Sequence, residues 1–213
     1  MKRIYNPSNF FLSGFMVIML SFGNAASKNN NSTANNEISE ESPIEKADTL
    51  KWIDDFRAFR EAVYHNERAK VKGFMDFPLV SPANEIWYIA YEGEDKKMSA
   101  LPDSSKPFTE KDFDKYYSKL FTNKFIKCLL KIKTEDFYRE GGVNSPEYKE
   151  GDVTTSLSVT VDKSDNTLTL NLITKTFIKV GDGEFDPVEG NLIFQFRILK
   201  SGKIKLKLIT AAG

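Results

Sequence analysis

The chain has 213 residues, 40% of them hydrophobic and 28% charged, and its 17 Phe supply enough large apolar side chains for a globular core. Lysine plus arginine total 30, as do aspartate plus glutamate, so the formal net charge is zero. This balance argues against nucleic acid as a partner, because phosphate backbones are bound by clustered excess cations.

The first 25 residues have the pattern of a secretory signal peptide. Lys2 and Arg3 give a positive start, residues 10–22 form an apolar run, and small residues suit cleavage after Ala25. The run is shorter than the roughly 20 residues that cross a membrane. We therefore expect an exported protein, periplasmic or secreted, without a membrane span after signal removal; an uncleaved anchor is the alternative.

Residues 26–48 are rich in Asn, Ser and Glu and have little to bury, so we interpret them as a flexible tether. The pattern changes at Thr49, and we expect a single domain over residues 49–213. Its first element is a helix, because apolar residues recur every three or four positions at Leu50, Ile53, Phe56, Phe59 and Val63. A short second helix is expected to carry Val71 and Phe74.

The chain has one histidine and one cysteine, which restricts its chemistry. His65 interrupts the helical pattern, which is typical of a helix-ending residue; a catalytic base oriented by Glu61 is the alternative. Cys128 lies in the apolar stretch "FIKCLLKI" and is expected to be a buried, inert thiol. One His and one Cys do not make a usual zinc site, so we expect neither a metal nor a cofactor.

The middle of the chain is predicted to hold a strand and two helices. Residues 85–93, "EIWYIAYEG", are rich in β-branched and aromatic residues and favour a strand. Thr109 and Asp112 fit a capping box flanked by Phe108 and Phe113, which predicts a helix start. A second helical piece is expected over residues 125–132.

The last third is predicted to form four antiparallel strands joined by short turns, with one face buried. Residues 181–190 are interpreted as a solvated hairpin loop, and weak calcium binding is the alternative. The spacing of the acidic residues does not match that of an EF-hand loop. Alternation places the following residues on the buried face: Leu157, Val159, Val161, Leu168, Leu170, Leu172, Leu192, Phe194, Phe196, Ile198, Ile204, Leu206 and Leu208.

This order of helices, strand, helices and strands predicts an α+β fold, with N-terminal helices packed on a curved antiparallel sheet. The order, together with the opening "FRAFREAVYHNERAKVKGFMDFPL", resembles the nuclear transport factor 2-like (cystatin-like) superfamily and its exported bacterial members of unknown function. The resemblance implies a cone that holds a small apolar ligand, and dimers formed through the sheet. Ketosteroid isomerase-like members use an inward carboxylate, whereas no inward residue predicted here is titratable.

Two groups of residues are candidates for binding. Trp87, Tyr91 and Tyr117 are predicted to line the mouth of the cone and to contact a ligand; the alternative is that they belong to the core. A second group, predicted to lie on the outward face of the sheet as a partner surface, is Ile173, Phe177, Ile193 and Leu199.

We therefore expect an exported, non-enzymatic domain that binds a small apolar ligand or a protein partner, and a homodimer remains open. The first alternative is an isomerase- or hydrolase-like enzyme that uses Asp76, Asp112 or Tyr117. That alternative requires Tyr117 and a carboxylate to converge in one pocket. The second alternative is an interaction module that works through the outer face of the sheet.

Overall fold

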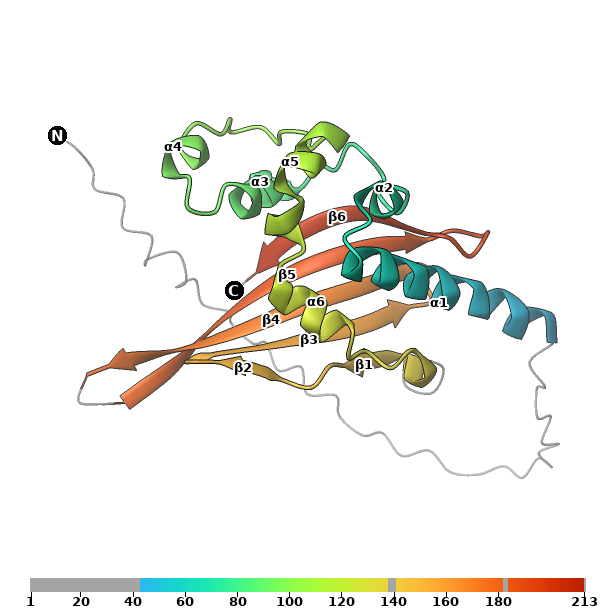
Figure 1. The fold of residues 1–213 in the computed structure, drawn as a ribbon. Helices are drawn as coiled ribbons and strands as arrows, with labels where there is room; N and C mark the ends of the chain where they lie inside the picture. Colours follow the sequence, from blue (N-terminus) through green and yellow to red (C-terminus); the bar gives the residue numbers. More distant parts are fainter. Residues whose placement is uncertain (1–42, 138–140, 182–183, 213) are drawn as a thin grey trace, which may run out of the picture. The chain divides into compact units, whose positions relative to one another are not determined.

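The computed structural model describes residues 43–137, 141–181 and 184–212 (Figure 1). The predicted signal peptide and residues 26–42 of the predicted tether lie outside the described residues. The first helix begins at Pro43, within the segment interpreted as a tether and before the expected start at Thr49. No helix in the described part of the chain is long and apolar enough to cross a membrane.

The fold is α+β, as predicted, with the helices in the N-terminal half and an open antiparallel sheet mostly in the C-terminal part. The elements in chain order are α1 (Pro43–Tyr64), α2 (Arg68–Lys72), η2 (Pro82–Asn84), α3 (Glu85–Ala90), α4 (Asp95–Met98), α5 (Glu110–Leu120), α6 (Asn123–Leu129), η3 (Thr134–Asp136), β1 (Gly142–Asn144), β2 (Tyr148–Glu150), β3 (Val153–Asp162), β4 (Thr167–Val180), β5 (Glu184–Ile198) and β6 (Ile204–Ala212). The strand order is β1-β3-β4-β5-β6, and β2 also pairs with β3.

The predicted strand over residues 85–93 is wrong, because Glu85–Ala90 form the helix α3 and residues 91–93 form a turn after it. Its buried residues Ile86, Trp87 and Ala90 are spaced as on one face of a helix. The buried Ser81 supports the first turn, since its hydroxyl accepts a hydrogen bond from the Ile86 amide at 2.9 Å. Packing of this face outweighs the β propensity of the aromatic and branched residues, which depends strongly on context.

The predicted capping box is confirmed at the start of α5. The Asp112 carboxylate accepts from the Thr109 amide at 3.0 Å, and the Thr109 hydroxyl accepts from the Asp112 amide at 3.4 Å. Phe108 and Phe113, predicted to flank the cap, are fully buried. The next helix, α6, begins in a similar way, because the Thr122 hydroxyl accepts from the Phe125 amide at 3.3 Å.

The four long strands predicted for the last third are confirmed as β3 to β6. The hairpin loop expected over residues 181–190 is wrong for most of its length, because β5 begins at Glu184 and pairs with β4 as far as Val180. The short strands β1 and β2 were not predicted. They pair with opposite ends of β3, and Ser145 lies between them, accepting from the Leu157 amide at 2.9 Å.

One inward position was predicted wrongly, because β6 contains a bulge. Leu206 pairs with Phe196, whereas Leu208 pairs with Gln195, so Lys207 is an extra residue on the β6 side. A bulge of one residue exchanges the two faces of the strand beyond it. Ile209, rather than Leu208, therefore points into the core, where it is fully buried.

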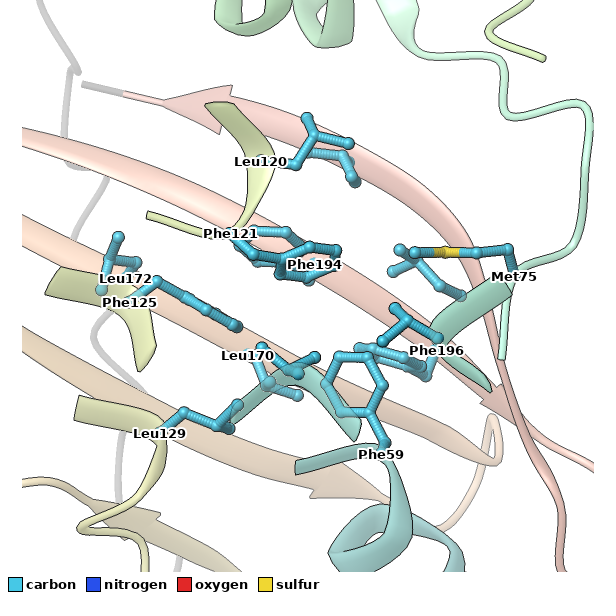
Figure 2. Packing of buried hydrophobic residues seen from close by; sticks show 14 of the residues in the cluster. Phe59, Met75, Leu120, Phe121, Phe125, Leu129, Leu170, Leu172, Phe194 and Phe196 are labelled. Atoms are coloured by element: carbon cyan, nitrogen blue, oxygen red, sulfur yellow. The ribbon is translucent and has the colours of Figure 1, made fainter. Parts of the chain in front are cut away.

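The core lies between the helices and one face of the sheet (Figure 1). Its centre is aromatic: Phe121 stacks on Phe194 with ring centroids 5.8 Å apart, and Phe59 packs edge-on against Phe196 at 5.1 Å. Figure 2 shows these rings meeting between the helices and β4 and β5, with Phe125 beside them. All five rings are at most 3% exposed.

The free edge of β6 is protected by other parts of the chain, which discourages edge-to-edge pairing with another sheet. The carboxylate of Asp55 in α1 accepts from the Ile204 amide at 2.9 Å. The Leu206 amide donates to the Phe74 carbonyl at 2.7 Å. Near the end of the strand, the Ala211 amide donates to Glu85 in α3 at 3.0 Å.

Candidate functional site

Two of the three predicted ligand-binding residues, Trp87 in α3 and Tyr91 directly after it, lie together, but they are part of the core. Trp87 is 1% exposed, and its ring contacts Tyr91, Phe108 and Tyr116. The Lys106 ammonium covers this cluster, 3.9 Å from the Trp87 ring centroid, which is a cation–π contact. The Trp87 indole also donates to the Lys106 carbonyl at 2.8 Å, so its polar atom has a partner within the chain.

Tyr117, the third predicted residue, faces a different environment. Its ring packs against Phe113 and Phe121, and the Arg68 guanidinium lies 5.0 Å from the ring centroid. The Tyr117 hydroxyl donates to the Val63 carbonyl at 3.4 Å. Burial raises the pKa of Tyr117, and the nearby Arg68 charge partly opposes this rise. The structure therefore does not bring Tyr117 to the cluster around Trp87.

The carboxylates named for an enzymatic alternative have separate structural roles. Asp112 belongs to the capping box of α5, and Asp76 pairs with Arg197 at 2.8 Å on the surface. Neither has a contact with Tyr117 in the described part of the chain. The convergence that the alternative requires is thus not present among the described residues.

The lone histidine and the lone cysteine occupy the predicted environments. His65 directly follows α1, is exposed, and lies 3.7 Å from Glu61, so its position at the end of the helix is confirmed. Cys128 is 1% exposed, and burial raises the pKa of its thiol, partly opposed by a hydrogen bond from Ser145. A thiol with a raised pKa is a poor nucleophile near neutral pH. Among the described residues, no three His, Cys, Asp or Glu side chains form a group suited to a metal ion.

Two adjoining surface grooves, of about 390 and 460 Å³, lie beside α1 and the turn between β5 and β6. Both are lined by Asp55, Ala58 and Lys203. The Lys203 ammonium contacts the Asp55 carboxylate at 2.7 Å, and Lys70 pairs with Glu67 at the same distance. The charges of these two ion pairs are therefore already neutralised within the chain. The contact between Lys203 and Asp55 also anchors the turn between β5 and β6 to α1.

The face of the sheet that points away from the helices, called the outer face below, is not covered by any described helix. Its residues alternate with the buried ones, and Figure 1 shows the helices gathered on the opposite side. The central part of the outer face consists of Ser156, Ser158, Thr160, Thr169, Asn171, Ile173, Asn191, Ile193, Gln195, Leu208 and Thr210, none of which is charged. The same alternation places Asp162, Lys175, Glu189, Arg197 and Lys205 on this face around the central part.

Apolar and amide side chains alternate across the centre of the outer face. Asn171 pairs with Ile193, and Ile173 pairs with Asn191, so the two isoleucines are diagonal neighbours. The bulge places Leu208 on this face diagonally next to Ile193, and this position was missed because strict alternation assigned it to the core. The Asn171 side-chain oxygen is buried and has no hydrogen-bond partner within the described chain. A buried acceptor without a donor is unfavourable, typically by about 1–3 kcal/mol.

The other two residues of the predicted partner surface lie outside this central area. Phe177 is on β4 beyond the last residue paired with β3, opposite Pro187, and is 41% exposed. There β4 and β5 continue as a two-stranded arm, which also exposes Ile178 and Val188. Leu199 is half-buried in the turn that follows β5, where its amide donates to the Lys203 carbonyl at 2.8 Å.

Comparison with known proteins adds little to what the structure shows. No family model matches the chain, and no curated protein matches it. Among solved structures, a putative calcium/calmodulin-dependent protein kinase II association domain from Xanthomonas campestris is similar over 85% of this chain and 95% of that chain. The identity is 12% and the TM-score is 0.24, so this likeness carries no argument about binding or assembly.

Proposed function

We propose that this chain is an exported, non-enzymatic interaction domain that docks a protein partner on its outer face. The observation that carries the proposal is the uncharged central part of this face, which contains Ile173 and Ile193 and which no described helix covers. Depletion of charge around apolar side chains is typical of the centre of an interface, and Ile173 and Ile193 are half-buried rather than fully covered. The buried, unpaired oxygen of Asn171 supports the same surface, because a partner can supply the missing donor.

Export is proposed on the sequence of the first 25 residues. The resemblance to the nuclear transport factor 2-like superfamily is proposed on the layer of helices over an antiparallel sheet. The strand expected over residues 85–93, which contributed to that resemblance, is a helix. The resemblance therefore rests on the layered architecture and on the opening motif.

A protein partner is favoured over a small apolar ligand because the space between the helices and the sheet is filled by the chain's own side chains. The rings of Phe59, Phe121 and Phe194 occupy the place where a cone-bound ligand would lie (Figure 2). Trp87 and Tyr91 are covered by Lys106. Neither aromatic group presents an open pocket with placed polar atoms, which is the usual form of a ligand site.

The test replaces Ile193 by Glu at the centre of the outer face. A carboxylate without a partner is costly to bury, and about 1.4 kcal/mol already corresponds to a tenfold loss of affinity. Tagged chains are expressed in the native host, and the proteins that co-purify, including untagged copies of the chain, are quantified by mass spectrometry. We expect Ile193→Glu to lose the bound protein by at least about tenfold.

Ile178→Glu is the matched control, because Ile178 is an exposed isoleucine on β4 whose side chain points to the opposite face. It makes the same chemical change without altering the outer face. Circular dichroism checks that both variants fold. If wild type, Ile193→Glu and Ile178→Glu retain the same proteins in the same amounts, the outer face is not the docking surface.

A further inference from the structure

The two-stranded arm of β4 and β5 projects beyond the rest of the sheet, at the lower left of Figure 1. β3 pairs with β4 only as far as Thr176, and β6 pairs with β5 only from Asn191. Six large hydrophobic side chains are exposed in the described part of the chain, and three of them lie on this arm: Phe177, Ile178 and Val188. A two-stranded ribbon is marginally stable by itself in water. The arm therefore has an apolar surface that the described chain does not cover.

One side of the arm combines apolar side chains with a carboxylate. Ile178 pairs with Asp186, and Thr176 pairs with Val188, so all four side chains lie on the side of the sheet that carries the helices. Ile178 and Val188 are diagonal neighbours and are 45% and 39% exposed. Asp186 is also exposed, and its carboxylate takes part in no ion pair of the described residues. This side of the arm is therefore an apolar ridge with an unbalanced negative charge.

The larger groove beside α1, of about 460 Å³, has the opposite charge. Phe74 and Ile204 give it an apolar wall, and three lysines surround this wall: Lys70, Lys203 and Lys205. Lys70 and Lys203 belong to the ion pairs described above. The Lys205 ammonium donates instead to the Gly73 carbonyl, a neutral acceptor. The charge of Lys205 is therefore not balanced by an ion pair within the described chain.

We propose that the arm of one copy of this chain docks in the groove of another copy. Ile178 and Val188 pack against the partner's Phe74. The Asp186 carboxylate pairs with the partner's Lys205, and opposite charges across an interface fix which surfaces meet and in which orientation. Neither surface belongs to the central part of the outer face, so the inference goes beyond the proposed function and does not depend on it.

The two surfaces lie at opposite ends of β5, so one chain cannot fill its own groove (Figure 1). From the arm at Gly190 to the turn after Ile198 the strand spans about 27 Å. Pairing with both β4 and β6 over this length keeps the strand extended. Copies therefore associate head to tail, each using two different surfaces. Such a heterologous interface continues into further copies, as a closed ring or an open filament.

Docking of side chains is favoured over pairing of strand edges at the arm. The Phe177 amide already donates to the Asp152 carbonyl at 3.1 Å. The paired Pro187 therefore presents its backbone nitrogen, which has no hydrogen, to the free edge of β5. A proline at a free edge interrupts the ladder of hydrogen bonds that another strand would form.

The test reverses the two proposed charges with Asp186→Lys and Lys205→Glu. In either variant alone, two like charges meet where arm and groove join. In an equimolar mixture, the basic arm of the first variant meets the acidic groove of the second. The unchanged arm of the second variant meets the unchanged groove of the first, so both contacts again join opposite charges.

Sedimentation velocity of the full chain, over increasing concentrations, measures association of wild type, each variant and the mixture. Like charges placed opposite each other cost several kcal/mol, so we expect each variant alone to associate at least about tenfold more weakly than wild type. The mixture is expected to recover the association of wild type, which also shows that both variants fold. Asp165→Lys and Lys163→Glu are the controls, because they make the same charge changes in the exposed turn between β3 and β4 and should associate like wild type.

Three results would overturn the inference. The first is a wild-type chain that stays monomeric at every concentration. The second is association of Asp186→Lys and Lys205→Glu as strong as that of wild type. The third is a mixture that does not recover, because the contact of Asp186 with Lys205 would then be absent.

The failure of this inference is distinguishable from failure of the proposed function. Ile193→Glu changes neither arm nor groove and should associate like wild type in sedimentation. In the co-purification experiment, Ile178→Glu should lose untagged copies of this chain, whereas Ile193→Glu should lose the protein docked on the outer face. Self-association that Ile193→Glu abolishes and the two charge variants leave intact would place the contact on the outer face and overturn the docking of the arm.

Discussion

Asp55 is the residue whose single substitution is expected to have the clearest structural effect. Its carboxylate is 7% exposed and accepts from the Ile204 amide at 2.9 Å and from the Lys203 ammonium at 2.7 Å. Hydrogen bonds to a charged group contribute about 1.5–3 kcal/mol, and a buried donor left unpaired adds a cost. We expect Asp55→Ala to lower the free energy of unfolding by about 2–4 kcal/mol, measured by urea denaturation.

The neighbouring Asp54 provides the control for this prediction. It also lies in α1 and pairs with Arg57 at 2.8 Å, but its side chain is 72% exposed. Exposed ion pairs contribute about 0–1 kcal/mol because water screens them. Asp54→Ala is therefore expected to change stability by less than about 1 kcal/mol. Equal losses for Asp54→Ala and Asp55→Ala would contradict the assigned role of the buried carboxylate.

Residue types alone indicated the environments of His65 and Cys128, because a helix-ending polar residue and an apolar stretch are local features. The exceptional position of Asn171 was not predictable in the same way. Its burial depends on neighbours in β3 and β5 that are distant in sequence. Nothing in the local pattern distinguishes Asn171 from Asn191, which has no buried unpaired oxygen among those identified.

At the scale of helices and strands, the sequence correctly predicted the features that depend on neighbouring residues alone. The capping box at Thr109 and the alternation in β3 to β6 are examples. The prediction was wrong where tertiary packing determines the secondary structure. Residues 85–93 have a strand-forming composition, yet Trp87 is buried as part of a helix. The bulge at Lys207 likewise has no glycine or other local signal, so the inward and outward assignments beyond it were reversed.

The start of α5 offers a prediction at this scale. The Thr109 hydroxyl accepts from the Asp112 amide and donates to the Asp112 carboxylate. Loss of an N-terminal capping side chain typically costs about 1 kcal/mol. We expect Thr109→Ala to lower the free energy of unfolding by about 1 kcal/mol, measured by chemical denaturation.

Ser118→Ala is the control for this cap, since Ser118 is exposed within the same helix. Alanine has the higher helix propensity there, so this change is expected to be neutral or stabilising by a few tenths of a kcal/mol, roughly 0.5 at most. If both substitutions destabilise equally, the effect comes from loss of a hydroxyl in general rather than from the cap.

At the scale of the whole molecule, the α+β architecture could be predicted because helical and strand patterns occupy separate parts of the chain. The candidate site could not be predicted in this way. The sequence placed Trp87, Tyr91 and Tyr117 around one opening, because Trp87 and Tyr91 were projected onto a strand that does not exist. Three members of the predicted partner surface, Ile173, Ile193 and Phe177, do point to the outward side of the sheet. Alternation along a strand is preserved in the fold, whereas convergence of distant elements depends on packing.

The filled interior gives the last prediction, which concerns whether the molecule holds a small apolar ligand. Phe121 is 3% exposed and contacts Tyr117, Phe125 and Phe194 with ring centroids 5.2, 5.6 and 5.8 Å away. Phe121→Ala removes this ring and is expected to cost about 3–5 kcal/mol. The resulting apolar cavity should bind benzene, as engineered apolar cavities do, and benzene should raise the stability of this variant alone.

Urea denaturation with and without benzene measures both effects. Phe177→Ala removes a ring that is 41% exposed, so it should cost far less and should give no response to benzene. If Phe121→Ala proves too unstable to fold, Phe121→Leu leaves a smaller cavity for the same measurement. A wild-type chain that is stabilised by benzene as strongly as the variant would mean that the interior accepts ligands. In that case binding of a small apolar molecule, rather than docking of a protein, becomes the better account of this fold.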